Sequence, residues 1–206
     1  MTDLNPHQNP VVLVHGIYDT VSKFKTLQAY LTDHGWSVHA LNLTPNDGSA
    51  PLEVLAQQVA DFVSDRFHPD QAIDLVGFSM GGVVTRYYLQ RLGGHQKVKR
   101  YISISAPNQG TWLGFSLPLP GVQQMRPGSQ FLADLNRDHH QFLATLKVTI
   151  IWTPFDLMIL PAASSQLGLG KEIVLPVPVH SWMVSDYRTL EVVKEALLEP
   201  LEVTLF

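Results

Sequence analysis

The sequence predicts an α/β fold with about six mostly parallel strands and helices on both faces of the sheet. Short apolar runs rich in β-branched residues alternate along the chain with segments whose apolar residues recur at helical spacing. This alternation is typical of βαβ units, which build a parallel sheet. The length of 206 residues is close to that of one large domain, so we expect a single domain over residues 1–206.

Each element has a local signal. The run PVVLV at residues 10–14 is short, continuous and β-branched, as expected of a strand buried on both faces. The helical stripe that follows stops at Gly35, and Pro51 suits the first turn of the next helix. The predicted strands lie at residues 10–14, 36–43, 72–76, 100–105, 147–152 and 172–179. The apolar stripes of the predicted helices lie at residues 21–31, 52–62, 83–92 and 190–197.

Residues 106–145 interrupt this alternation, because a connection of that length is unusual between neighbouring elements. The segment from Trp112 to Met125 is rich in apolar residues, prolines and glycines, and the run PGSQFLADLN at 127–136 predicts a short helix. We expect residues 106–145 to form a small cap or lid over the ends of the strands. The alternative is a loop that folds back to complete the core.

The composition excludes several classes of protein. The net charge is −4 and the basic residues are scattered, so nucleic acid is not an expected partner. One small basic group, Lys97, Lys99 and Arg100, is expected to be solvated at the start of a strand. Because the chain has no cysteine, it has no disulfides and no thiolate metal sites.

The sequence predicts a cytoplasmic location and no transmembrane segment. The first ten residues, MTDLNPHQNP, are polar and lack the basic-then-apolar pattern of a signal peptide. No apolar run approaches the roughly 18 to 20 residues that a membrane span needs.

The run DLVGFSMGG at residues 74–82 predicts a nucleophile at Ser79. A sharp strand-to-helix turn raises a serine hydroxyl above the sheet, and the residues two positions before and after it must be very small. Gly77 and Gly81 occupy those positions, and the helix that begins at Met80 adds the positive end of its dipole. The alternative is a glycine turn that only lets the helix pack on the sheet.

A nucleophilic serine needs a base and a carboxylate that orients the base, and in this architecture the acid precedes the histidine. His180 follows the last predicted strand, and Asp156 follows the strand at 147–152 in the same way. We therefore predict His180 as the base and Asp156 as the acid. The alternatives are a structural histidine and a loop aspartate that binds local N–H groups. The less suitable candidates are His95, His139, His140, Asp134, Asp138, Glu172 and Asp186.

An oxyanion hole needs two backbone N–H groups. Met80, the residue after the nucleophile, is expected to supply one, and the loop after the first strand the other. In that loop Gly16 lets the backbone approach closely, so the N–H of Ile17 is predicted to point into the site. We interpret His15 as a positioning residue, and the alternative is a second base.

These runs together resemble the α/β-hydrolase superfamily, and within it the small bacterial lipases of the Bacillus lipase A type and their cyanobacterial relatives. The resemblance covers roughly residues 10–200 and implies Ser79, Asp156 and His180 as a catalytic triad. It also implies a minimal six-stranded sheet, because few residues precede the first strand. The runs that carry it are VVLVHGIYDT (11–20), GFSMGG (77–82), APNQGT (106–111), PFDLMILPAAS (154–164) and HSWM (180–183).

The resemblance implies a serine hydrolase that cleaves carboxylic esters through an acyl-enzyme, of the lipase or esterase type, without a metal or organic cofactor. The expected substrate is an acyl ester or lipid, and an apolar cap would also permit peripheral contact with a lipid surface. An acyltransferase or thioesterase that uses the same three residues stays open as an alternative. The complete set of Ser79, Asp156 and His180 argues against a different class, a non-catalytic binding protein that keeps the fold.

Overall fold

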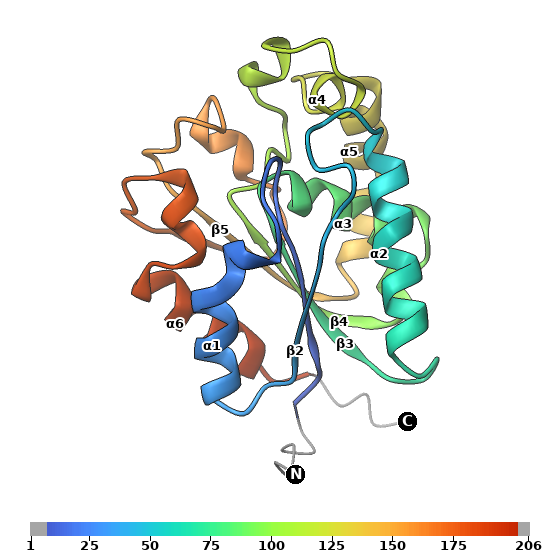
Figure 1. The fold of residues 1–206 in the computed structure, drawn as a ribbon, viewed down its shortest axis with the longest axis vertical. Coiled ribbons are helices and arrows are strands. Elements are labelled where there is room, and N and C mark those ends of the chain that lie inside the picture. The colour runs from blue at the N-terminus through green and yellow to red at the C-terminus, as the bar shows by residue number, and fades with distance from the viewer. Residues whose placement is uncertain (1–7, 202–206) are drawn as a thin grey trace.

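The computed structural model describes residues 8–201, which form one sheet of six strands with helices on both faces (Figure 1). The strand order is β2-β1-β3-β4-β5-β6, and every pair of neighbouring strands is parallel. This arrangement confirms the predicted fold class. All six strands therefore present their carboxyl ends at one edge of the sheet, where a parallel sheet places its ligand site.

The strands are β1 (Val11–Val14), β2 (Val38–Leu41), β3 (Ile73–Phe78), β4 (Val98–Ile104), β5 (Lys147–Trp152) and β6 (Lys171–Val174). The helices are α1 (Lys25–Asp33), α2 (Leu52–Arg66), α3 (Met80–Arg91), α4 (Pro120–Gln124), α5 (Gln130–Leu143) and α6 (Tyr187–Leu198). Short 3₁₀ turns lie at Val21–Phe24, Gly94–Gln96, Trp112–Phe115, Ala162–Ser165 and His180–Val184. Within residues 8–201, none of the helices has the length and apolar character that a bilayer crossing requires.

The sheet separates two hydrophobic cores. Val11 and Leu13 pack with α1 and α6 on one face, whereas Val12 and Val14 pack with α2, α3 and α5 on the other. This alternation follows from the strand, in which successive side chains point to opposite faces. The strands are buried on both faces because helices cover both, which explains their continuous apolar runs.

The last strand is shorter than the sequence predicts. Residues 172–179 were expected to pair, but β6 ends at Val174. Pro176 and Pro178 follow, and neither has an N–H group to give to the neighbouring strand. The chain beyond β6 is instead held by the hydroxyl of Thr153, which donates to the carbonyl of Val177 at 2.6 Å.

The long segment at residues 106–145 contains more helix than the sequence predicts. The expected short helix is α5, which has 14 residues and buries Leu132, Leu135 and Leu143. These side chains join the core beneath α3, so the second half of the segment completes a helical layer. The part before α5, by contrast, exposes Trp112 and Phe115 at the carboxyl edge of the sheet. Residues 106–145 thus show features of both alternatives, and their role as a cap or lid stays a prediction.

A buried ion pair joins β3 to β4 and corrects one expectation. Arg100 was expected in a solvated basic group, but its guanidinium donates to the carboxylate of Asp74 at 3.0 Å, and both side chains are buried. The same guanidinium donates to the carbonyl of Glu199 at the end of α6. Burial raises the pKa of the Asp74 carboxyl to about 6, although Arg100 opposes the shift. The pair thus ties the last helix to the centre of the sheet.

We expect Asp74→Ala to lower the free energy of unfolding by about 3–5 kcal/mol, because it leaves the Arg100 cation buried without its partner. The measurement is urea denaturation at pH 8, where the native carboxylate is ionised. Asp65→Ala, at an exposed position of α2, is the control and should leave the unfolding midpoint unchanged. Equal stability of the two variants would contradict this role for the pair.

Candidate active site

The turn between β3 and α3 holds Ser79 in a backbone conformation that is rare for a residue with a side chain. Its φ is 54° and its ψ is −128°. Strain of this kind persists only where the surrounding structure enforces it, and it concentrates at functional sites. A methyl group on Gly77 would lie 2.5 Å from the hydroxyl oxygen of Thr85, and one on Gly81 would collide with the carbonyl oxygens of Val14 and His15. Both glycines are therefore required by the packing of α3 against β1 and β3.

Asp156 and His180 come together although 24 residues separate them. Asp156 lies in the loop after β5, and His180 begins the 3₁₀ turn that follows β6. The Nδ1 of His180 lies 2.7 Å from Oδ2 of Asp156. Because an ionised carboxylate only accepts, this contact puts the proton on Nδ1 and leaves Nε2 free to act as a base.

The other carboxylate oxygen of Asp156 is held by the backbone. Its Oδ1 accepts hydrogen bonds from the N–H groups of Met158 at 2.8 Å and Ile159 at 2.9 Å. Asp156 is only 3% exposed, so the whole carboxylate is fixed by hydrogen bonds inside the protein. A carboxylate held in this way can orient the imidazole of His180.

Ser79 and His180 line the same cavity, of about 240 Å³. Phe78 forms part of its wall and packs against the imidazole, with 4.9 Å between the ring centroids. Asp19 and Lys23 lie on its polar side. The structure thus brings the predicted nucleophile, base and acid to one place at the carboxyl edge of the sheet.

The less suitable candidates for base and acid lie elsewhere, outside the cavity that Ser79 and His180 line. The tilted rings of His139 and His140 lie against each other in α5, and the Nδ1 of His95 lies 3.0 Å from the carbonyl oxygen of Leu89. Asp134 and Asp138 bind Arg91. Asp186 caps α6 by accepting from the N–H of Arg188, and Glu172 accepts from Gln166.

A second cavity, of about 120 Å³, opens on the other side of Ser79. Ile17 and Met80, the two predicted oxyanion-hole residues, both line it. Met80 is the first residue of α3, and the first N–H groups of a helix have no partner inside that helix. The N–H of Ile17 likewise forms no hydrogen bond within residues 8–201. Two N–H groups are therefore available beside the Ser79 hydroxyl.

His15 and Gly16 shape the loop that carries Ile17. The ring of His15 is fully buried, with Nδ1 2.9 Å from the carbonyl of Gly16 and Nε2 accepting from the N–H of Leu43 at 3.0 Å. Burial lowers the pKa of His15, which favours the neutral ring. Both ring nitrogens already have hydrogen-bond partners, which favours the predicted positioning role of His15 over that of a second base. A methyl on Gly16 would lie 2.9 Å from the Cβ of Ser79, so only glycine fits there.

Several residues that line the second cavity were not predicted as site residues. Apolar side chains from the segment at 106–145 form its wall, and Met158 and Ile159 close it from the loop after β5. Tyr18, at its mouth, is 63% exposed and has a φ of 59°. The sequence placed the apolar segment from Trp112 to Met125 over the strand ends, but spacing did not identify which side chains reach Ser79, because that depends on how the loops fold. The wall residues from the long segment are Pro107, Thr111, Leu113, Gly114, Ser116, Leu117, Val122 and Met125.

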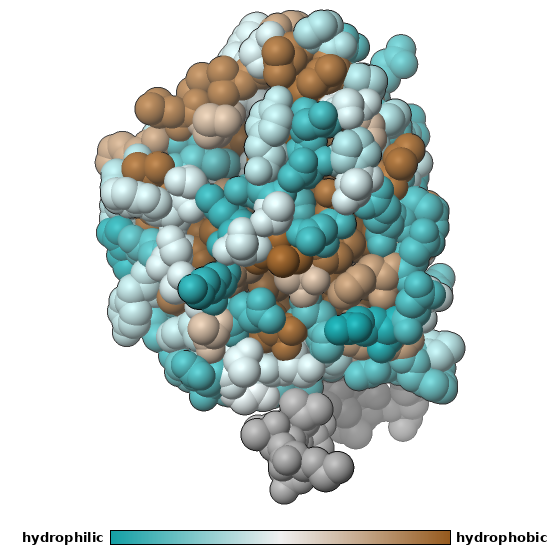
Figure 2. Space-filling model, viewed as in Figure 1, coloured by the Kyte–Doolittle hydropathy of each residue, from teal (hydrophilic) through white to brown (hydrophobic). Residues whose placement is uncertain are grey.

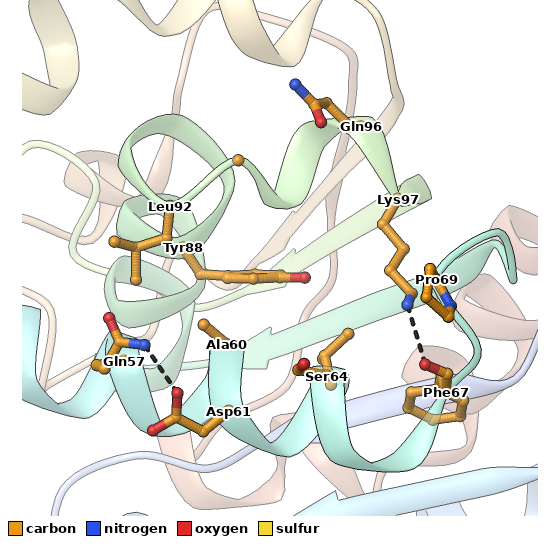
Figure 3. Close-up of a pocket in the computed structure, with 12 residues that line it drawn as sticks. Gln57, Ala60, Asp61, Ser64, Phe67, Pro69, Tyr88, Leu92, Gln96 and Lys97 are labelled. Carbon is orange, nitrogen blue, oxygen red and sulfur yellow. Dashed lines mark hydrogen bonds between the residues drawn. The ribbon is translucent and has the colours of Figure 1, made fainter.

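A larger cleft, of about 500 Å³, lies between α2 and the end of α3, away from Ser79 (Figure 3). Tyr88 points into it, and the ammonium of Lys97 donates to the carbonyl of Phe67 at its edge. Phe67 and Lys97 precede β3 and β4, so the cleft faces the amino ends of these strands. It contains none of the predicted site residues, and cavity size alone therefore does not identify the site.

Part of the chain is similar to a known family. The family model described as palmitoyl protein thioesterase matches residues 10–115, about half of the chain. Human lysosomal thioesterase PPT2 is 34% identical over 116 residues, which cover 52% of this chain and 37% of the human protein. The mouse protein of the same name is 33% identical over 109 residues, 50% of this chain and 35% of its own length. The chain thus spans little more than a third of these relatives, and the family match includes Ser79 but ends before Asp156 and His180.

Solved structures share the whole fold. Bacillus licheniformis lipase BlEst2 in its mature form has a TM-score of 0.77 at 16% identity, covering 96% of this chain and 95% of that chain. Aspergillus fumigatus lipase B has a TM-score of 0.76 at 18% identity, covering 95% of this chain and 54% of that chain. The chain therefore has the α/β-hydrolase fold, as its resemblance to that superfamily predicted. At these identities the likeness concerns the fold alone.

We expect Asp156→Asn to slow the reaction of Ser79 with a fluorophosphonate probe by up to about 10⁴-fold, because an amide favours the wrong tautomer of His180. The labelling rate would be measured by intact-mass spectrometry. Asp138→Asn is the matched control, since Asp138 binds Arg91 and Gln90 away from both cavities, and it should label at the wild-type rate. Equal rates for the two variants would contradict the assignment of Asp156.

Proposed function

The chain belongs to the palmitoyl protein thioesterase family, and from this membership and the geometry at Ser79 we propose that it is a serine hydrolase of acyl esters. The observation that carries the proposal is the cavity that Ser79 shares with His180, whose Nδ1 is held by Asp156. The same three residues occur in the expected order along the chain, and each follows the carboxyl end of a strand.

In the proposed reaction, His180 Nε2 takes the hydroxyl proton as Ser79 Oγ attacks the carbonyl carbon of the ester. The N–H groups of Ile17 and Met80 stabilise the negative oxygen of the tetrahedral intermediate, an effect typically worth about 10²–10³ in rate per donor. His180 then gives its proton to the departing alcohol or thiol, which leaves an acyl group on Ser79. Water attacks this acyl-enzyme with His180 again as base, and the acid is released.

In this proposal the two cavities at Ser79 bind different parts of the substrate. The cavity toward the segment at 106–145 is lined mainly by apolar side chains and suits the acyl chain. The cavity at His180 also contains Asp19, Lys23 and Ser181, and it suits a more polar leaving group, to which His180 delivers the proton. Lys23 and Asp19 pair at 3.7 Å, so their charges offset each other.

The atom that links the acyl group to its leaving group is oxygen or sulfur. The sequence favoured an oxygen ester, whereas the names of the family and of its mammalian members describe thioesterases. The oxyanion-hole and triad chemistry is the same for both, because both pass through a tetrahedral oxyanion. A thioesterase is therefore the second candidate, and it rests on family membership.

We also propose that the carboxyl edge of the sheet meets a lipid surface. Six apolar side chains on the loops after β4, β5 and β6 are between 45% and 76% exposed around the site. Figure 2 shows apolar residues gathered at the top of the molecule, where Figure 1 places the segments between β4 and α5. Exposed apolar groups in this number favour contact with lipid. These residues, called the apolar rim below, are Trp112, Phe115, Phe155, Leu157, Met158 and Trp182.

The cellular location stays a prediction. The sequence predicts a cytoplasmic protein, with peripheral contact with a lipid surface through the apolar segment from Trp112 to Met125. The mammalian relatives are described as lysosomal, which is a statement about those proteins.

We expect the purified protein to hydrolyse p-nitrophenyl acyl esters and acyl thioesters, and Ser79→Ala to remove this activity, because the nucleophile is lost. Ser64→Ala, at an exposed position of α2, is the matched control and should keep full activity. Hydrolysis is followed by release of nitrophenol or of free thiol. The ratio of the two rates at equal acyl length separates an esterase from a thioesterase. Full activity of a folded Ser79→Ala variant would contradict the proposed nucleophile.

We expect the triple variant Trp112→Ser, Phe155→Ser, Leu157→Ser to bind phosphatidylcholine vesicles at least about 10-fold more weakly than the wild type, since it removes much of the apolar rim. Vesicle cosedimentation measures the effect. Val54→Ser is the control, because Val54 is 49% exposed on α2, outside the rim. Equal binding by all three proteins would rule out the rim as the lipid-contacting surface.

A further inference from the structure

The hydroxyl of Thr111 joins two segments that are far apart in sequence. One is the segment at 106–145, in which Thr111 precedes the 3₁₀ turn at Trp112–Phe115. The other is the loop after β5, residues 153–161, called the acid loop here because it carries Asp156. Thr111 is 5% exposed, so its hydroxyl works in an environment with little water.

Thr111 binds the acid loop from both directions. Its Oγ1 donates to the carbonyl of Met158 at 2.8 Å and accepts from the N–H of Leu160 at 3.0 Å. The next residue, Trp112, donates its N–H to the carbonyl of Leu160 at 2.9 Å. These three bonds fix the backbone on both sides of Ile159.

The bond to Met158 acts on the peptide group that holds Asp156. The carbonyl of Met158 and the N–H of Ile159 belong to one planar peptide unit. Its carbonyl accepts from Thr111, and its N–H donates to Oδ1 of Asp156 at 2.9 Å. Hydrogen bonds that share a peptide group polarise and orient each other. A continuous path thus runs from the Thr111 hydroxyl through this peptide to Asp156 and on to Nδ1 of His180.

The chain just before Thr111 is itself held rigidly. Arg86 of α3 is fully buried and donates to the carbonyl of Asn108 and to the side chain of Asn136 in α5. Asn136 also donates to the carbonyl of Asn108, and Asn108 donates to the carbonyl of Ser165. Burial lowers the pKa of Arg86 to about 10, so it is a cation at neutral pH. These hydrogen bonds hold the backbone before Thr111 in place, so the Thr111 hydroxyl can in turn position the acid loop.

We propose that Thr111 is a positioning residue for the acid of the triad, and that through it the segment at 106–145 and the acid loop form one unit. This inference rests on the proposed function, since it assigns Thr111 to the same site. In this role Thr111 does not transfer a proton to or from the substrate, because its hydroxyl hydrogen is donated to the carbonyl of Met158. It acts by holding the peptide that orients Asp156, and Asp156 in turn orients His180.

The test compares Thr111→Val with Thr111→Ser, because valine keeps the shape and removes the hydroxyl, whereas serine keeps the hydroxyl. We expect Thr111→Val to lower kcat by about 10- to 100-fold with little change in KM, the size of effect that a small misplacement of a catalytic group produces. We expect Thr111→Ser to retain most of kcat. Val63→Ala, a buried change in α2, is the control for lost stability and should keep kcat.

A second readout is independent of turnover. The Nδ1 proton of His180, bonded to Asp156, should give a low-field proton NMR resonance that Thr111→Val weakens or shifts and Val63→Ala leaves in place. Unchanged kcat and resonance in folded Thr111→Val would overturn the inference, as would loss of kcat with an unchanged resonance. A wild-type protein without hydrolase activity would instead count against the proposed function, and the resonance would still report on Thr111.

Discussion

The close approach of α3 to the sheet at Ser79 is the constraint on which the rest of the site depends. A side chain at Gly81 would collide with the carbonyl oxygens of Val14 and His15, so only glycine lets the start of α3 lie this close to the end of β1. The same close approach brings Met80 to the cavity that Ile17 also lines, and Ser79, between β3 and α3, has a positive φ. A larger residue at 77 or 81 would separate the helix from the sheet. The nucleophile and both oxyanion donors would then be displaced together.

The other half of the site depends on polar contacts between loops. Asp156 and His180 lie on connections that regular secondary structure does not fix, so hydrogen bonds position them instead. Two backbone N–H groups and the imidazole hold the carboxylate, and Thr111 holds the backbone that supplies one of those groups. Behind Thr111, the buried Arg86 cation connects α3 with α5. The same helix therefore starts at the nucleophile and anchors the segment that supports the acid.

Much of the fold was predictable because its signals are local. Apolar runs and helical stripes identify β1, β3, β5 and the helices around them. The glycines around Ser79 indicate a turn that only small residues permit. The features that sequence reasoning missed depend on distant partners. Arg100 is buried because Asp74 lies on the neighbouring strand, and β6 is short because prolines end its pairing with β5. The support of Asp156 by Thr111 spans 45 residues of sequence, and no spacing rule links the two positions.

The most direct test of the site is a crystal structure of the protein after reaction with an alkyl phosphonate, which mimics the tetrahedral intermediate. The account predicts a phosphorus–oxygen bond to Ser79 Oγ, with the phosphonyl oxygen about 2.7–3.1 Å from the backbone nitrogens of both Ile17 and Met80. It also predicts the alkyl chain in the cavity lined by Val122 and Met125. Phosphonylation of another residue would contradict the account, as would a phosphonyl oxygen turned away from those two nitrogens.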